Sequence, residues 1–313
     1  MAGVIALEIQ RNGASKGLAS YESLQRRLHI TSRPALLPGS DPKNPVAESV
    51  AKTGAGLVNV PALLANPLDV NPSKLELGDG FAAKTRTITV TNNGNRAKRY
   101  TIGHLPSRSV EGSNGVPTVG FKYSNTFAKV SFSSQIVSVA PGQSASFVVT
   151  VDPVAEQNAF WIRSGFITLT DASDEKPELS IPYALLANDY GKYPVFDSTF
   201  MPALVPGGAI DDPSIPPFEE DAKPTFDLKT KETSPAVLLS TVFPVRRLTV
   251  ALVPADKPTN VLGYLLVDDF AQNREAAAIL LNAEVQDVND ETKAVPVEDG
   301  EYRIVIQYVR PRH

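Results

Sequence analysis

The sequence of 313 residues contains no cysteine, which excludes disulfide bonds, thiolate metal sites and thiol catalysis. No apolar stretch approaches the length of about 18 residues that indicates a membrane-spanning helix. The net charge is only −4, so nucleic acid is not an expected partner. The first residues lack the basic region and the cleavage site of a secretory signal peptide. What remains is a globular chain long enough for two or three domains, each with its own core.

The chain opens on an apolar segment, residues 1–10, in which Val4, Ile5, Leu7 and Ile9 are accompanied by almost no polar residues. A helix that is hydrophobic nearly all round belongs inside a larger body. Burial of each of these four side chains is worth about 1.5–3 kcal/mol. We therefore predict a buried helix, and we interpret the chain as the C-terminal part of a longer polypeptide.

A second, amphipathic helix is predicted over residues 21–28, where apolar residues recur at helical spacing after Ser20, a suitable N-cap. Residues 31–48 are rich in proline, serine and glycine, which favours a surface loop. The stretch 54–60 begins Gly-Ala-Gly and predicts a tight turn into a short element.

From residue 71 the apolar period changes to two, which indicates β-strands. Residues 92–95, Asn-Asn-Gly-Asn, are expected to form a hairpin turn. Short strands separated by turns are typical of an immunoglobulin-like or fibronectin-III-like sandwich. The expected strands cover residues 73–77, 87–91, 99–102, 130–132, 136–139, 145–151, 165–169 and 179–183.

Residues 201–235 are rich in proline and acidic residues and predict a linker or a loosely held loop. Strands resume over residues 236–243, 247–253, 277–281 and 302–306, which predicts a second, smaller sandwich, truncated before its final strand. The expected domains are a helical segment at 1–62, a fibronectin-III-like sandwich at 63–190, a linker at 191–235 and the second sandwich at 236–313.

Four stretches carry a family resemblance. Residues 1–7 read Met-Ala-Gly-Val-Ile-Ala-Leu, residues 28–34 end a helix before a proline, residues 53–60 read Thr-Gly-Ala-Gly-Leu-Val-Asn-Val, and residues 72–183 end in Ser-Ile-Pro-Tyr. In this order they resemble the subtilisin-like serine proteases (subtilases, peptidase family S8). The similar branch carries a fibronectin-III-like domain behind the protease domain, as in fungal secreted subtilases and streptococcal complement-cleaving peptidases.

The resemblance implies a mainly β chain: two tandem sandwiches preceded by a short helical remnant of a subtilisin-like α/β domain. The family's aspartate, histidine and serine would lie upstream of Met1, so we assign no catalytic, cofactor-binding or metal site here, and the chain alone is expected to be inactive. The implied parent is a secreted endopeptidase without an organic cofactor. Its sandwiches would pack on the missing protease domain, supplied in cis or in trans, and help to present protein substrates.

Catalytic look-alikes within the chain are better explained as structural residues. His29 and His104 are expected to be packing or surface residues, because a general base needs a nucleophile within reach. Ser15, in a Gly-x-Ser-x-Gly stretch, lacks the preceding strand and oxyanion loop of a hydrolase. Residues 49–52 and 52–54 mimic two penicillin-binding motifs but share one lysine.

Three further features have a structural and a functional interpretation. Gly54-x-Gly56 lacks the third glycine of a dinucleotide fingerprint, so a turn is preferred. Trp161 is expected in the core between two sheets rather than as a ligand platform. The loop 287–298 is either a solvated acidic loop or a weak cation site; its acidic and amide candidates are Asp287, Asn289, Glu291 and Glu298.

A protein of another class also fits the sequence. Two sandwiches with residues 1–60 as a helical cap would suit a free-standing adhesion or carbohydrate-binding protein. A third interpretation is that the sequence comes from a truncated gene model.

Overall fold

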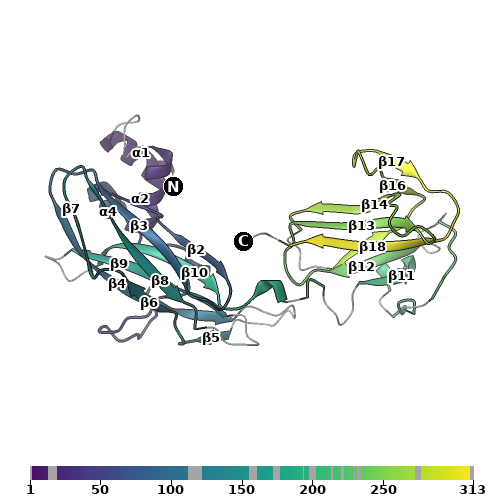
Figure 1. Ribbon diagram of the computed structural model, residues 1–313, viewed down its shortest axis with the longest axis horizontal. Helices are drawn as coiled ribbons and strands as arrows, with labels where there is room; N and C mark the ends of the chain where they lie inside the picture. Colours follow the sequence, from purple (N-terminus) through teal and green to yellow (C-terminus); the bar gives the residue numbers. More distant parts are fainter. Residues whose placement is uncertain are drawn as a thin grey trace. The chain divides into compact units, whose positions relative to one another are not determined.

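The computed structural model describes residues 2–12, 20–111, 122–154, 161–171, 177–192, 194–196, 202–212, 214–219, 222–228, 230, 234–271 and 276–310. These residues form two compact units, one ending at Tyr190 and one beginning at Gly191 (Figure 1). Both units are built mainly of β-strands arranged in sandwich-like sheets, with a few short helices. No helix in the described ranges is long and apolar enough to cross a membrane.

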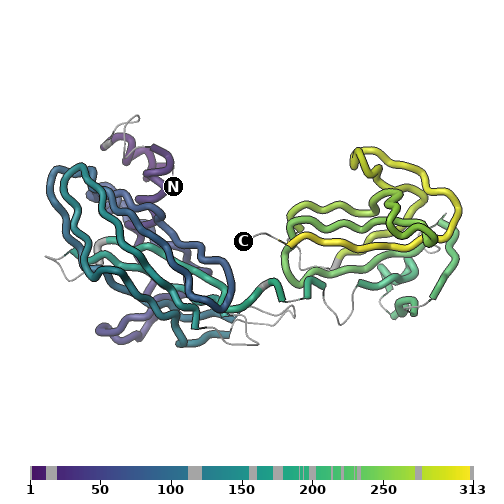
Figure 2. The backbone as a smooth tube through the Cα atoms, in the orientation of Figure 1, coloured from purple at the N-terminus to yellow at the C-terminus, as the bar shows by residue number. Residues whose placement is uncertain are grey.

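The first unit begins with four short helices: α1 (Ala2–Asn12), α2 (Tyr21–Thr31), α3 (Val50–Thr53) and α4 (Val60–Ala65). The two predicted N-terminal helices are thus confirmed. The hydroxyl of Ser20 accepts a hydrogen bond from the Ser23 amide at 3.2 Å, as an N-cap should. Figure 2 shows the purple N-terminal helices beside the strands of the first unit, with α1 on their outer side.

The strands of the first unit form two sheets. One has the order β1-β3-β8-β6, and the other has the order β2-β10-β9-β4-β5, with β7 also paired to β4. All the strands expected between residues 73 and 183 are present. Their bounds are β1 (Leu68–Asn71), β2 (Leu75–Asp79), β3 (Lys84–Asn92), β4 (Lys98–Glu111), β5 (Lys122–Ser124), β6 (Lys129–Phe132), β7 (Ile136–Val139), β8 (Ser144–Asp152), β9 (Trp161–Asp171) and β10 (Pro177–Leu186).

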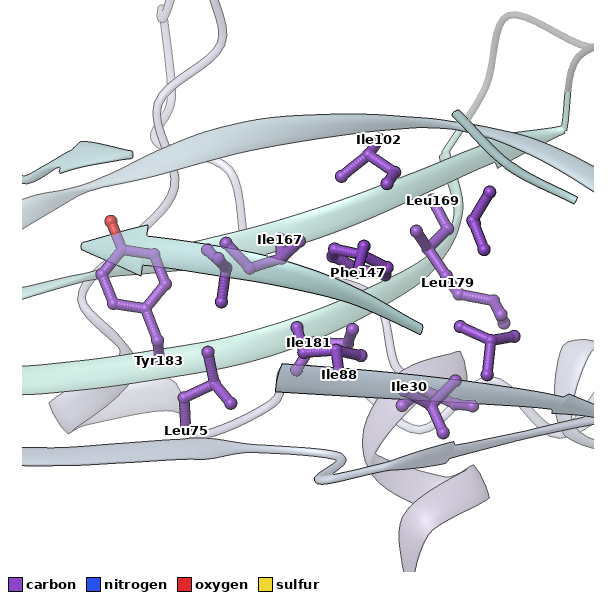
Figure 3. Close-up of a cluster of buried hydrophobic side chains, with 14 of the residues drawn as sticks. Ile30, Leu75, Ile88, Ile102, Phe147, Ile167, Leu169, Leu179, Ile181 and Tyr183 are labelled. Carbon is purple, nitrogen blue, oxygen red and sulfur yellow. The ribbon is translucent and has the colours of Figure 1, made fainter. Parts of the chain in front are cut away.

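The core of the first unit lies between these sheets and includes one helix. Ile88 on β3 and Ile167 on β9 are fully buried, and Ile30 of α2 belongs to the same cluster (Figure 3). Because α2 packs on β1 and β10, the helices and the sandwich form one compact unit rather than two.

The turn at residues 92–95 does not close a hairpin, which corrects the sequence prediction. The strands on either side, β3 and β4, lie in different sheets. The Asn92 side chain holds the crossing by accepting from the Gly94 amide at 2.9 Å and donating to the carbonyls of Arg96 at 2.8 Å and Val139 at 3.1 Å. An Asn-Gly pair marks a turn, but its contacts decide where the next strand goes.

The second unit also has two sheets, one ordered β11-β12-β15 and the other β17-β16-β14-β13-β18. Their facing side chains form a second core, to which Val237 and Leu239 contribute from one sheet and Leu248 and Val250 from the other. The strands are β11 (Ala203–Pro206), β12 (Pro235–Ser240), β13 (Arg247–Pro254), β14 (Gly263–Asp269), β15 (Ala276–Leu280), β16 (Glu284–Gln286), β17 (Ala294–Pro296) and β18 (Tyr302–Val309).

Part of the predicted linker belongs to this second unit, which is a second correction. Strand β11 pairs with β12, and the short helix η3 (Gly207–Ile210) packs beside them. Val195, shortly after the helix η2 (Tyr190–Lys192), is buried in the same core. A high proline content therefore did not prevent this segment from pairing, because β11 is a sheet edge, where proline is tolerated.

Candidate docking surface on the N-terminal helix

A buried arginine links helix α1 to the rest of the first unit. The guanidinium of Arg27 is fully buried and donates to the Glu8 carboxylate on α1. It also donates to the carbonyl oxygens of Leu63 at 2.7 Å and Asn66 at 2.9 Å, at the C-terminal end of α4. A cation is stabilised at a helix C-terminus by the carbonyl groups that the helix leaves free. Arg27 therefore ties three helices together.

The apolar side chains of α1 are not enclosed by this arrangement. Val4 and Ile5 are half-buried, whereas Leu7 is 47% exposed and Ile9 is 39% exposed. The sequence predicted a buried helix, but within the described residues the one fully buried side chain of α1 is the charged Glu8. We call the exposed apolar side chains of the helix, Ala2, Ala6, Leu7 and Ile9, the α1 face.

The glycine turn before α4 has the geometry that its sequence predicted. Gly56 has a φ of +103°, and a Cβ atom there would lie 1.9 Å from the Arg33 carbonyl oxygen, so only glycine fits. Leu57 pairs with Arg33 through its backbone, while its side chain is 72% exposed. The turn thus presents a further apolar side chain at the surface of the first unit.

The two histidines that the structure describes make local contacts. Nδ1 of His29 lies 3.0 Å from the Ser73 hydroxyl, but burial and the nearby Lys74 lower the pKa of His29. Nε2 of His104 lies 2.8 Å from the Tyr183 hydroxyl, and burial lowers the pKa of His104 to about 4. A subtilisin-type base is held by a carboxylate, whereas the charge that shifts His29 is a cation.

The other catalytic look-alikes take part in packing. Ser49 is fully buried and its hydroxyl lies 3.3 Å from that of Ser164 on β9. Lys52 donates to the Tyr123 hydroxyl at 2.8 Å and pairs with Glu48. Ser15 lies outside the described residues, as does His313, the third histidine of the sequence.

Trp161 does not lie in the core, contrary to the sequence prediction. It is half-buried at the beginning of β9, and the guanidinium of Arg163 lies 5.3 Å from its ring centroid. Arg163 is itself fully buried and donates to the Thr126 carbonyl at 2.9 Å. The buried apolar side chains of β9 are instead those of Phe166, Ile167 and Leu169.

The acidic loop after β16 uses its carboxylates for local contacts. The Asp287 carboxylate accepts from the Asn289 amide at 2.7 Å, and the Glu291 carboxylate pairs with Arg247. Within the described ranges, no group of three or more histidine, aspartate or glutamate residues is placed to hold a metal ion.

In the described part of the second unit, a cavity with both apolar and polar walls lies beside β14 and β16. Its volume is about 330 Å³, at the lower end of the range for small-ligand sites, about 300–1,000 Å³. Tyr264 and Leu280 line it together with the polar side chains of Asn282, Glu284 and Gln286.

Residues 75–184 match a family model described as an Fn3-like domain. The chain is therefore a β-sandwich protein whose first unit contains an Fn3-like domain. A comparison with curated proteins gives no match.

Solved structures that resemble the chain do so at low identity. A PapD-like domain of human CEP192 has 9% identity over 38% of this chain and 82% of that chain, with a TM-score of 0.28. The CupB2 chaperone of Pseudomonas aeruginosa has 10% identity over 77% and 100%, with a TM-score of 0.26. The VesB protease of Vibrio cholerae has 17% identity over 39% and 32%, with a TM-score of 0.23. At these scores none of them bears on function.

Proposed function

We propose that this chain is the non-catalytic region behind the catalytic domain of a secreted subtilisin-like serine endopeptidase, and that α1 packs against that domain. The observation that carries the proposal is α1 itself. Helix α1 is apolar in composition, as a core element is, yet Leu7 and Ile9 lie at the surface while Glu8 forms a buried ion pair with Arg27.

The Fn3-like domain supports the same proposal. Domains of this family occur in the C-terminal region of subtilases. In this chain the domain follows α1 and the glycine turn in the order that the sequence resemblance requires. The sandwich would then hold the helices in place and extend the surface that receives a protein substrate.

The contacts of the histidines are consistent with a region that does not itself hydrolyse peptides. His104 is held against Tyr183 and burial lowers its pKa, while burial and the cation of Lys74 lower the pKa of His29. The peptidase activity would come from the catalytic domain, which would supply the serine, the histidine and the aspartate.

The test is to capture the native protein from its source with an antibody against residues 75–184 and to label it with a fluorophosphonate. We expect one labelled serine, and sequencing of the labelled peptide should give a Gly-Thr-Ser-Met pattern that lies outside the 313 residues. The purified 313-residue chain serves as the control and should remain unlabelled and inactive on casein.

Two results would contradict the proposal. One is stoichiometric labelling of a serine within the 313 residues. The other is a native protein that carries no labelled serine hydrolase, whether joined to the chain or bound to it.

The alternative of a carbohydrate-binding protein is favoured by one observation, the 330 Å³ cavity with Tyr264 and the amides of Asn282 and Gln286 in its walls. Amide side chains beside an aromatic ring suit a polyhydroxylated ligand. Screening the chain against a glycan panel tests this alternative, with Asn282→Ala as the variant expected to abolish any binding.

A further inference from the structure

The cavity of the second unit collects side chains from three neighbouring strands, β14, β16 and β17 (Figure 1). Tyr264 on β14 lies directly opposite Gln286 on β16, and Gln286 lies opposite Ala294 on β17. Glu284 comes two residues before Gln286, so both side chains leave β16 on the same side. All four residues line the cavity, and Ala294 fills little of it, because its side chain is a single methyl group.

Most of the charges in the cavity wall are already compensated. The Lys293 ammonium lies 2.9 Å from the Asp290 carboxylate. The Glu291 carboxylate pairs with Arg247. The carboxylate of Glu284 differs from these groups, because it forms neither an ion pair nor a hydrogen bond with another described residue. Among the described residues of the wall, the charge left unpaired is therefore negative.

A second acceptor in the wall also lacks a donor. The side-chain oxygen of Gln286 is buried, and no described residue donates a hydrogen bond to it. A buried acceptor without a donor is unfavourable, so a ligand that donates to this oxygen gains free energy on binding. Glu284 and Gln286 together favour a ligand that carries both hydrogen-bond donors and a positive charge.

The apolar part of the wall suits the carbon chain of such a ligand. Leu265 and Leu280 line the cavity, and Leu280 is 38% exposed. Tyr264 contributes an aromatic ring, and a cation held over such a ring is attracted to its π electrons. Lysine and arginine side chains have this combination, because an alkyl stem that packs on apolar surface ends in a charged group.

We propose that this cavity binds a short alkyl chain that ends in a cation, as in a lysine or arginine side chain of a peptide or in an aliphatic diamine. The Glu284 carboxylate and the Gln286 oxygen accept hydrogen bonds from the cation, and the stem packs on Leu265 and Leu280. Amide groups would also suit a sugar, but an uncharged sugar leaves the charge of Glu284 uncompensated. The proposal is independent of the proposed function, because it uses only the second unit.

The test is to titrate the purified 313-residue chain with small ligands and to follow its amide signals by NMR. N-acetyl-arginine amide and N-acetyl-lysine amide represent peptide side chains, and putrescine represents a free diamine. N-acetyl-citrulline amide is the control, because it has nearly the shape of the arginine probe but no charge. We expect saturable shifts at residues 264 and 284–286 with a cationic probe, and at least about 10-fold weaker binding of the citrulline probe.

The same titration distinguishes the two sources of the cation. Tighter binding of the two amino-acid amides than of putrescine would support a peptide ligand. Tighter binding of putrescine would support a free amine.

A pair of glutamate variants tests the role of the unpaired carboxylate. Glu284→Gln removes the charge but keeps the shape, and it should raise the dissociation constant of the cationic probe about 10-fold. Glu298→Gln is the matched control, because Glu298 is exposed in the same unit but does not line the cavity. Glu284 is also exposed, so both variants should fold, and equal melting temperatures would verify this.

Three results would overturn the proposal. The first is the absence of saturable shifts with every cationic probe. The second is equal binding of the arginine and citrulline probes, and the third is an equal effect of the two glutamate variants. Binding of an uncharged glycan without binding of any cationic probe belongs to the first result and would favour the carbohydrate-binding alternative. None of these results depends on whether a catalytic domain covers α1.

Discussion

The Nε2 atom of His104 lies 2.8 Å from the hydroxyl oxygen of Tyr183, although the two residues belong to strands separated by β9. The contact is possible because Gly165 lies between them on β9. A Cβ atom at position 165 would lie 2.7 Å from the Tyr183 hydroxyl. The tyrosine thus crosses over a glycine to reach a buried histidine in the Fn3-like sandwich.

Because His104 is buried, we predict that acid lowers the free energy of unfolding of the first unit. Burial lowers the pKa of His104 from 6.5 to about 4. Between these values the unfolded chain binds a proton that the folded chain does not bind, so the free energy of unfolding falls as the pH decreases from 6.5 to 4. The loss due to His104 should reach about 3 kcal/mol at most and then stop growing.

The measurement is urea unfolding at several pH values with His104→Gln as the reference. Glutamine can still hydrogen-bond to Tyr183 but does not titrate, so subtracting its pH dependence removes the contributions of all other groups. Parallel curves for the two proteins would show that His104 is not the group responsible.

A second prediction concerns Arg27, whose loss removes the buried guanidinium that donates to the Glu8 carboxylate and to the carbonyl groups at the end of α4. Arg27→Met should lower the free energy of unfolding by about 3–5 kcal/mol. The neighbouring Arg26→Met is the matched control, because Arg26 is partly exposed and binds Asp69, so its loss should cost about 1 kcal/mol. Equal losses, measured by urea unfolding, would contradict the role given to the buried pair.

A third prediction tests whether the helices and the sandwich unfold together. Ile30 of α2 is fully buried in the sandwich core, whereas Tyr21 on the same helix is 75% exposed. Ile30→Ala should destabilise the unit by about 2–5 kcal/mol, and amide exchange should speed up in α2 and β10 alike. Tyr21→Ala should change neither the stability of the unit nor the amide exchange of α2 and β10. Faster exchange confined to α2 would mean that the helices unfold separately.

A fourth prediction compares two glycines with positive φ. At Gly142 (φ +69°) a Cβ atom meets nothing within 4 Å, so Gly142→Ala should cost about 1–2 kcal/mol for the backbone conformation alone. At Gly56 the added atom would also collide with the Arg33 carbonyl, so thermal unfolding of Gly56→Ala should show a clearly larger loss. Similar losses at the two positions would show that the turn relaxes.

The sequence predicted the strands of the Fn3-like sandwich well, because their buried residues alternate along the chain with exposed ones. Ile88 and Val90 on β3, and Phe147 and Val149 on β8, show this apolar period of two. It did not predict β14. There Leu265 and Leu266 are adjacent and both pack against the core, beside a register shift in the pairing with β13, so no alternation is visible.

The candidate docking surface was predictable only in part. The apolar composition of α1 predicted a helix that packs inside a larger body. The glycines predicted the turn at residue 56. The sequence could not show that Glu8 would turn inward toward Arg27, 19 residues away, and leave Leu7 at the surface. That outcome depends on where α4 places its free carbonyl groups, which is a tertiary property.

The central claim is that the α1 face is covered by a catalytic domain in the native protein, and hydrogen exchange of residues 2–12 tests it most directly. Their amide exchange should be fast in the purified 313-residue chain and at least about 100-fold slower in the native protein captured from its source, as expected for a helix that becomes part of a core. The same exchange rate in both samples would contradict the claim.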